Sequence, residues 1–188
     1  MLTIGLAMLQ GARHEHMHAL TNAASSLDIE IEIRELRKSS DIAGIDAIIL
    51  PGGESTAMKI ASRSEELYSG IWDCLKENSI PVLGTCAGAI LLSNNRIINA
   101  EIERNAFGRQ RDSFQSTIKI DIDGKEDFPG VFIRAPRFIG RCENAIAWLG
   151  DEAVGVLEGN RMALTFHPEL TDDLRFHVWL IKQAISNN

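Results

Sequence analysis

The sequence of 188 residues predicts an α/β fold in which a central, mostly parallel sheet is flanked by helices and the second half is rich in β-structure. Three observations support this prediction. In the first half, short apolar runs typical of buried parallel strands alternate with amphipathic segments. In the second half, short β-like runs are separated by turn sequences. No Pro- or Ser-rich linker interrupts the chain, so we expect a single domain over residues 1–188.

The first half alternates between predicted strands and predicted helices. Apolar runs, and one strictly alternating segment at 29–33, predict strands at residues 2–9, 29–33, 46–50 and 81–84. Apolar residues at helical spacing predict helices over residues 12–26 and 65–78. This strand–helix alternation is typical of a parallel sheet with helices on both faces.

After about residue 96 the pattern changes to short β-like runs. They cover residues 97–103, 116–121, 131–134, 145–149, 153–157 and 162–166. Turn sequences such as Asp123-Gly124 separate several of them. A last amphipathic helix is predicted over residues 172–185.

The composition argues against several classes of protein. With 19 Lys and Arg against 26 Asp and Glu, the net charge is −7, which argues against a general nucleic-acid binder. No apolar run approaches the ~18–20 residues of a membrane span, and no basic leader precedes the first strand, so neither a membrane protein nor a secreted one is expected. Three Cys without a CxxC pair argue against a disulfide framework. We therefore expect a cytoplasmic, reducing location.

A cysteine lies between a predicted buried strand and an apolar helical run, in the sequence Gly84-Thr85-Cys86-Ala87-Gly88. This Gly-x-Cys-x-Gly spacing is that of a nucleophile elbow, in which glycines on both sides let a side chain stand on a tight turn. Unpaired N–H groups at a helix N-terminus favour the thiolate, and the next amide would face a developing oxyanion. The alternative is a small buried cysteine in a tight turn.

A histidine and a glutamate follow the strand-like run at 162–166, in the sequence His167-Pro168-Glu169. Pro168 steers the preceding residue away from the α region, and in an extended chain residues two apart project to the same side. Glu169 would then hold the tautomer of His167 while the other ring nitrogen takes a proton from a thiol. The alternative is a structural histidine beside a surface glutamate.

Two glycines follow the predicted strand at 46–50, in the sequence Pro51-Gly52-Gly53. They leave backbone amides bare, so this loop could supply an oxyanion donor or bind a phosphate. The alternative is a plain strand-to-helix turn with Ser55 or Thr56 as the N-cap.

The remaining histidines have less specific interpretations. His14 and His18 would share one face of the first helix, but no third ligand is indicated, so no metal site is predicted. Glu15-His16 is assigned to a partner-facing start of that helix. His177 is interpreted as a surface or packing residue of the last helix.

Taken together, the three motifs resemble the Cys-His-Glu glutaminase domains of class I amidotransferases, which implies that fold. A narrower resemblance, to the glutaminase subunits of pyridoxal 5'-phosphate synthases, depends on four further stretches. These are residues 9–12 with Glu15-His16, residues 104–110 (RNAFGRQ), residues 132–136 (FIRAP) and residues 166–171 (FHPELT). The likeness runs in the same order along the chain, from about residue 4 to residue 177.

The resemblance implies hydrolysis of L-glutamine to glutamate and ammonia through a γ-glutamyl thioester, without a cofactor. It also implies a separate synthase subunit that receives the ammonia for vitamin B6 biosynthesis. The nucleophile falls on Cys86 and its partners on His167 and Glu169. As a separate mechanistic hypothesis, the backbone amides of Ala87 and Gly53 are expected to hold the oxyanion. The glutamine-binding positions fall on Gly53, Glu54, Ser55, Arg104, Ile133 and Arg134. Arginine suits such a site because its planar guanidinium grips a carboxylate through two N–H bonds.

Two alternatives remain beside this hypothesis. One is the glutaminase subunit of another amidotransferase, or a stand-alone γ-glutamyl hydrolase, against which the RNAFGRQ stretch argues. The other is a catalytically silent scaffold of the same fold, against which the intact Cys86, His167 and Glu169 argue. The stretch between the elbow helix and Arg104 is shorter than is usual in the resembling family.

Overall fold

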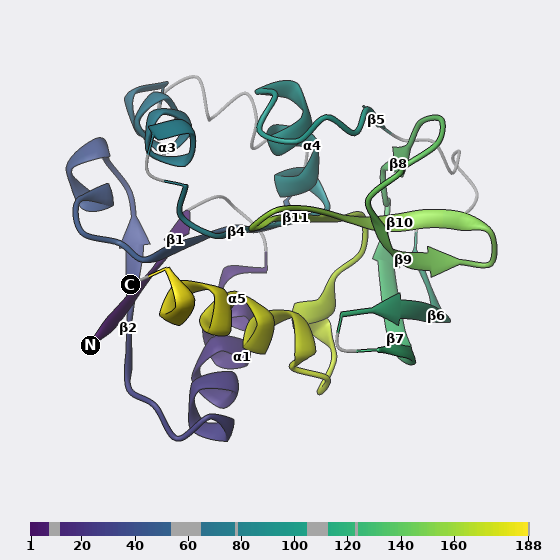
Figure 1. Cartoon of the computed structure of the whole chain (residues 1–188), viewed down its shortest axis with the longest axis horizontal. Helices are drawn as coiled ribbons and strands as arrows, with labels where there is room; N and C mark the ends of the chain where they lie inside the picture. The colour runs from purple at the N-terminus through teal and green to yellow at the C-terminus, as the bar shows by residue number, and fades with distance from the viewer. Residues whose placement is uncertain (8–11, 54–64, 78, 105–112, 123, 188) are drawn as a thin grey trace.

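The computed structural model of the chain describes residues 1–7, 12–53, 65–77, 79–104, 113–122 and 124–187 (Figure 1). The predicted residues Gln10, Gly11, Glu54 and Ser55, and the RNAFGRQ stretch beyond Arg104, therefore lie outside the described part of the chain.

A nine-stranded sheet forms the centre of the molecule, and its first five strands run parallel. In spatial order these are β2 (Ile31–Leu36), β1 (Leu2–Ala7), β3 (Ala47–Leu50), β4 (Val82–Thr85) and β11 (Arg161–Leu164). The other four pair antiparallel: β10 (Glu152–Glu158), β9 (Ala145–Leu149), β6 (Ser113–Asp121) and β7 (Lys125–Ile133). A small second sheet pairs β5 (Ile102–Glu103) with β8 (Arg137–Phe138). The predicted α/β class, with a β-rich second half, is confirmed.

Helices cover both faces of the parallel half of the sheet (Figure 1). One face carries α1 (Arg13–Ser26) and α5 (Arg175–Ser186), and the other carries α3 (Glu65–Glu77) and α4 (Ala87–Asn94). Two single turns of 3₁₀ helix, η1 (Ser39–Ile42) and η3 (Pro168–Leu170), complete the described elements. No helix among the described residues is both long and apolar enough to cross a membrane.

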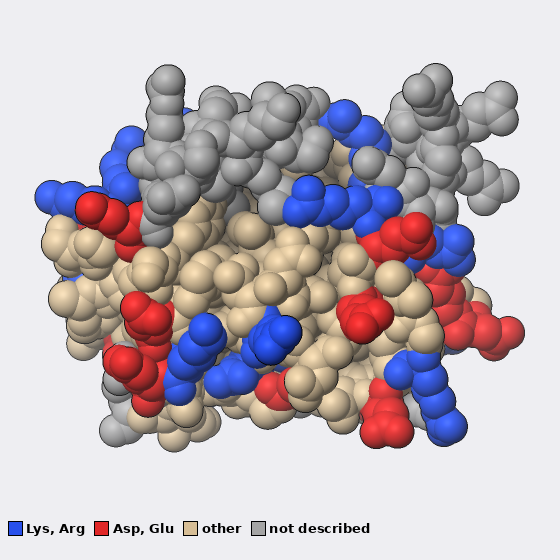
Figure 2. Space-filling view, turned by 90° about the horizontal axis from the view of Figure 1, so that it is seen from above, with Lys and Arg blue, Asp and Glu red and all other residues tan. Residues whose placement is uncertain are grey.

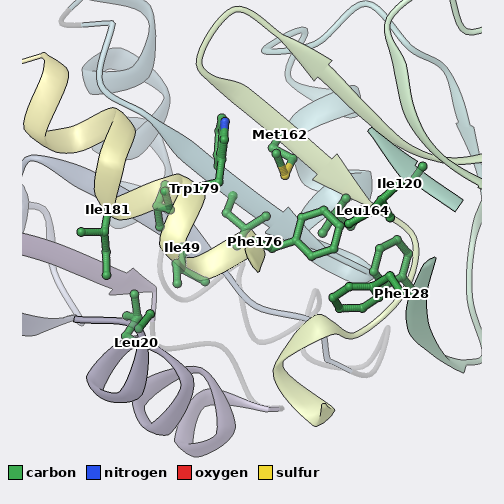
Figure 3. Packing of buried hydrophobic residues seen from close by; sticks show 14 of the residues in the cluster. Leu20, Ile49, Ile120, Phe128, Met162, Leu164, Phe176, Trp179 and Ile181 are labelled. Carbon is green, nitrogen blue, oxygen red and sulfur yellow. The ribbon is translucent and has the colours of Figure 1, made fainter. Parts of the chain in front are cut away.

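Two hydrophobic cores lie on opposite faces of the sheet, because successive strand residues point to opposite sides. Ile49 of β3 faces the core beneath α1 and α5, where it joins Leu20, Phe176 and Ile181 (Figure 3). The neighbouring Ile48 belongs to the core beneath α3 and α4. The continuous apolar run of β3 is therefore explained by burial on both faces.

One predicted strand, at residues 97–103, is wrong for most of its length. Helix α4 ends at Asn94, and the chain turns through Arg96 with a positive φ of 56°. Ile97 and Ile98 are buried in the core beneath α3 and α4, and only Ile102–Glu103 pairs as a strand. These isoleucines are apolar because they fill that core from a turn, which the sequence pattern does not distinguish from a strand.

Candidate active site

Cys86 stands on the tight turn between β4 and α4. Its backbone has φ 48° and ψ −105°, a conformation that L-residues rarely adopt, and its N–H donates to the carbonyl of Leu164 at 2.8 Å. A Cβ on Gly84 would lie 2.9 Å from the carbonyl oxygen of Gly88, and one on Gly88 would lie 1.9 Å from that of Leu50. Both glycines are therefore required by backbone packing.

His167 and Glu169 form a buried pair immediately after β11. The His167 Nδ1 lies 2.7 Å from the Glu169 Oε1, and the two side chains are 8% and 0% exposed. The backbone N–H of His167 donates to the carbonyl of Val131 at 2.8 Å, which joins the pair to β7. Pro168 begins η3, and this turn directs Glu169 into the interior.

The backbone of Gly52 packs against both Cys86 and His167. A Cβ at this position would lie 2.6 Å from the His167 Cε1 and 3.0 Å from the Cys86 Cβ, so the Gly52 backbone touches both residues. Burial alone would lower the pKa of His167, but its hydrogen bonds with Cys86 and Glu169, and the charge of Glu169, raise it to about 10. This environment favours the protonated imidazole.

The amides near Cys86 differ in whether they are already bonded. The N–H of Gly52 donates to the Thr85 Oγ1 at 3.1 Å, so it is directed away from the thiol. Ala87 is the first residue of α4, where backbone N–H groups have no partner within the helix. Gly53 is the last described residue of its loop.

Of the predicted glutamine-binding residues, the structure brings Ile133, at the end of β7, next to the thiol. The Cys86 Sγ lies 3.9 Å from the carbonyl oxygen of Ile133. Arg134 follows in a positive-φ conformation of 43° with an exposed side chain. Arg104 is exposed just after β5.

Comparison with known proteins decides the family of the chain. The profile of the SNO glutamine amidotransferase family matches residues 6–186. The chain belongs to this family. It is 41% identical to the pyridoxal 5'-phosphate synthase subunit PdxT of Thermococcus onnurineus and 38% identical to that of Pyrococcus furiosus. Each alignment covers 98% of this chain and 100% of the relative.

Solved structures agree with this family membership. A crystal structure described as a glutamine amidotransferase superposes with a TM-score of 0.79 at 38% identity, covering 96% of this chain and 98% of that one. The PurLQS structure from Thermotoga maritima, at 17% identity and a TM-score of 0.70 over 99% of this chain and 98% of that one, shares the fold alone. The alignment with the Thermococcus onnurineus relative runs over 199 positions, more than the 188 residues here, so it includes positions that this family member lacks.

Two further histidines of this family member are buried behind the glutamate, where the sequence interpretation did not place them. His16 and His177 are both 0% exposed, and the His16 Nδ1 lies 3.0 Å from the His177 Nε2. The assignment of His16 to a partner-facing surface is therefore wrong, and His177 is a packing residue rather than a surface one. His14 and His18 are exposed, and no cluster that could hold a metal occurs among the described residues.

A helical repeat could have revealed the burial of these histidines. His16 shares its face of α1 with Leu20 and Ala23, at i+4 and i+7, and both are buried. His177 likewise shares its face of α5 with Ile181 and Ala184. The spacing predicts burial of the two histidines, but it does not predict that they meet.

Proposed function

We propose that this chain hydrolyses L-glutamine to glutamate and ammonia as the glutaminase subunit of a pyridoxal 5'-phosphate synthase, and passes the ammonia to the synthase subunit. The main support is a cysteine on a strained elbow beside the buried His167–Glu169 pair, in a chain that aligns end to end with PdxT relatives. Such an arrangement of thiol, imidazole and carboxylate is typical of nucleophilic acyl transfer. The whole chain acts as one glutaminase domain.

The reaction begins with the thiolate of Cys86, which attacks the side-chain carbonyl carbon of glutamine. The amides of Ala87 and Gly53 hold the oxyanion of the tetrahedral intermediate, each donor contributing about 3 kcal/mol. The His167 imidazolium gives its proton to the departing nitrogen, so that ammonia leaves and a γ-glutamyl thioester remains. His167 then takes a proton from water, whose oxygen attacks the thioester and expels glutamate and the thiolate.

Glu169 orients and stabilises the imidazolium through the 2.7 Å bond to the His167 Nδ1. Residues 53–55, Arg104, Ile133 and Arg134 bind the glutamine, and the arginines are suited to its α-carboxylate. Cys74, Cys86 and Cys142 form no disulfide bond, which fits a reducing compartment, and we place the protein in the cytoplasm. On the face shown in Figure 2, acidic and basic side chains are interspersed, which does not favour a nucleic-acid partner.

Glutaminase activity is low until the synthase binds, because a free glutaminase would waste glutamine. The synthase completes the oxyanion hole by ordering either Gln10 and Gly11 or the Gly52-Gly53 loop. The test is release of glutamate and ammonia from L-glutamine by the purified chain, with and without a pyridoxal 5'-phosphate synthase subunit. Equal rates would refute the gating, and absence of turnover with the synthase would favour a silent scaffold.

A further inference from the structure

A buried polar cluster lies directly behind the Cys86–His167–Glu169 site. It consists of His16 from α1, Thr85 from β4, Glu169 from η3 and His177 from α5. The side chains of His16 and Glu169 are 0% exposed, and Thr85 and His177 are fully buried as residues. Four buried polar groups from four elements are costly unless they satisfy one another, so their contacts indicate a built arrangement.

His16 lies at the centre of this cluster. Its Nε2 is 3.2 Å from the Thr85 Oγ1 and 3.4 Å from the Glu169 Oε2. Its Nδ1 is 3.0 Å from the His177 Nε2. Glu169 therefore has a histidine at each carboxylate oxygen, because its Oε1 bonds to His167.

The tautomers follow from which groups must donate. A carboxylate oxygen only accepts, so a hydrogen bond from His16 to Glu169 requires the hydrogen on the His16 Nε2, whereas the Thr85 hydroxyl can either donate or accept at this nitrogen. The Nδ1 of His16 then accepts, and the His177 Nε2–H donates to it. This leaves the Nδ1 of His177 as an acceptor, and that buried nitrogen has no hydrogen-bond partner in the part of the chain that the structure describes. The opposite arrangement would leave a buried N–H donor at the same place, which costs more than an unused lone pair.

We propose that His16 is a positioning residue, whose neutral Nε2–H holds the second carboxylate oxygen of Glu169 and so fixes the carboxylate against His167. This role rests on the function proposed above. Glu169 would otherwise be free to rotate about its terminal bond, because its Oε2 has no hydrogen bond of ordinary geometry with any of the described residues. The 3.4 Å contact with His16 is long for a hydrogen bond, and we expect it to shorten in the complex with glutamine.

The neutrality of His16 matters because a second cation would compete with His167 for the charge of Glu169. Burial, with the nearby His177 and His167, keeps the pKa of His16 well below its ordinary value. Burial also lowers the pKa of His177 to about 4. Protonation of the His16 Nδ1 would in addition place two N–H donors against each other, at the 3.0 Å contact with His177.

Thr85 connects this cluster to the glycine loop. Its Oγ1 lies next to the His16 Nε2 and accepts a hydrogen bond from the backbone N–H of Gly52. The Gly52 backbone in turn contacts His167 and Cys86. Loss of the His16 donor therefore disturbs the triad from two directions, through Glu169 and through the Gly52 loop.

The experiment compares two amide substitutions that differ only in reach. His16→Gln places an amide N–H near the position of the imidazole Nε2, whereas His16→Asn reaches about as far as Nδ1, where it can pair with His177 but not with Glu169. Each variant is assayed for glutaminase activity with the synthase. The rate at which iodoacetamide alkylates Cys86 is also followed against pH by mass spectrometry, with the Cys74 and Cys142 peptides as internal references.

We expect His16→Gln to stay within about threefold of the wild-type kcat, and His16→Asn to lose about 10- to 100-fold in kcat with KM within twofold. In His16→Asn, the pH of half-maximal alkylation of Cys86 should rise by about one unit, because a loosened Glu169 stabilises the His167 imidazolium less. His16→Gln should keep the wild-type alkylation profile. Thermal unfolding monitors the folding of both variants.

Equal behaviour of the Gln and Asn variants, or a wild-type alkylation profile in His16→Asn, would overturn the proposal. The alkylation measurement needs neither glutamine nor the synthase. If the wild type released no ammonia with the synthase, the proposed function would fail, and the two alkylation profiles would still decide whether His16 acts on the Cys86–His167 pair. Should His16→Asn not fold, the His16→Leu variant keeps an apolar side chain at this buried position, donates nothing to Glu169 and should shift the alkylation profile in the same direction.

Discussion

Replacement of Gly52 by alanine tests whether the close approach of this backbone to His167 is required. The added Cβ would lie 2.6 Å from the His167 Cε1, whereas carbon atoms in contact lie about 3.5–4.0 Å apart. Either the imidazole or the loop must therefore move by about 1 Å. Gly52 has no positive φ, so alanine adds no backbone strain of its own and the collision is the main effect.

Both ways of relieving the collision damage the site. Movement of the ring stretches the 2.7 Å bond from the His167 Nδ1 to Glu169, and movement of the loop breaks the bond from the Gly52 N–H to Thr85. A displacement of about 1 Å in an active site costs roughly 10²-fold in rate. Overpacking of this kind costs about 1–3 kcal/mol of stability, so the variant should still fold.

The assay is the kcat/KM for ammonia release in the presence of the synthase, together with the thermal midpoint. We expect Gly52→Ala to lose about 100-fold in kcat/KM. The matched control is Gly70→Ala in α3, where the added Cβ meets the flexible end of Ile42 at 2.9 Å, and where activity should not change. A kcat/KM for Gly52→Ala within threefold of the wild type would refute the reasoning.

Three other changes probe the thiol, the elbow and the buried histidines. Cys86→Ala should reduce the rate of ammonia release by at least about 10³-fold without lowering the thermal midpoint, whereas the control Cys74→Ala should leave the rate unchanged. A smaller reduction in Cys86→Ala would show that Cys86 is not the nucleophile. Gly88→Ala places a Cβ 1.9 Å from the Leu50 carbonyl oxygen, a backbone atom that cannot rotate away, so we expect the free energy of unfolding, measured in urea, to fall by about 3 kcal/mol or more. A fall below about 1 kcal/mol, on the order of an ordinary substitution, would contradict this packing. Because the pKa of His177 is lowered to about 4, the unfolded chain binds one more proton at this residue than the folded chain between pH 6.5 and 4, so the free energy of unfolding should fall by about 3 kcal/mol from this residue as the pH drops through this window. In urea unfolding at pH 7, 5.5 and 4.5, a His177→Leu variant should therefore show a shallower fall than the wild type. Equal slopes for the two proteins would disagree with the burial of a neutral His177.

The parts of the fold that sequence predicts well are those encoded by local periodicity. The runs at 46–50 and 81–84 are strands β3 and β4, and the segments at 12–26 and 65–78 are helices α1 and α3. The apolar run at Ile97 and Ile98 does not form the predicted strand, because these residues are buried by tertiary packing from a turn. An apolar pair shows that a segment is buried, but it does not show which backbone conformation buries it.

The residues of the candidate site divide in the same way. The elbow at Cys86 and the pair His167 and Glu169 are recognisable because each depends on neighbours in the sequence, and the structure brings them together. His16 and His177 are 161 positions apart, and nothing local to either shows that they touch. A buried helical face containing a histidine indicates only that some other element must satisfy that histidine.

Gly52 and Gly53 show how a weak local signal acquires its meaning from distant residues. As a sequence, the pair indicates only bare amides after a strand. In the structure, Gly52 is excluded from bearing a side chain by His167, and its N–H is already bonded to Thr85. Of the two glycines, we therefore expect Gly53 to supply the proposed oxyanion donor, and Gly52 lets the backbone approach the imidazole. The two adjacent glycines thus serve different physical requirements, which is why substitutions at the two positions should be interpreted separately.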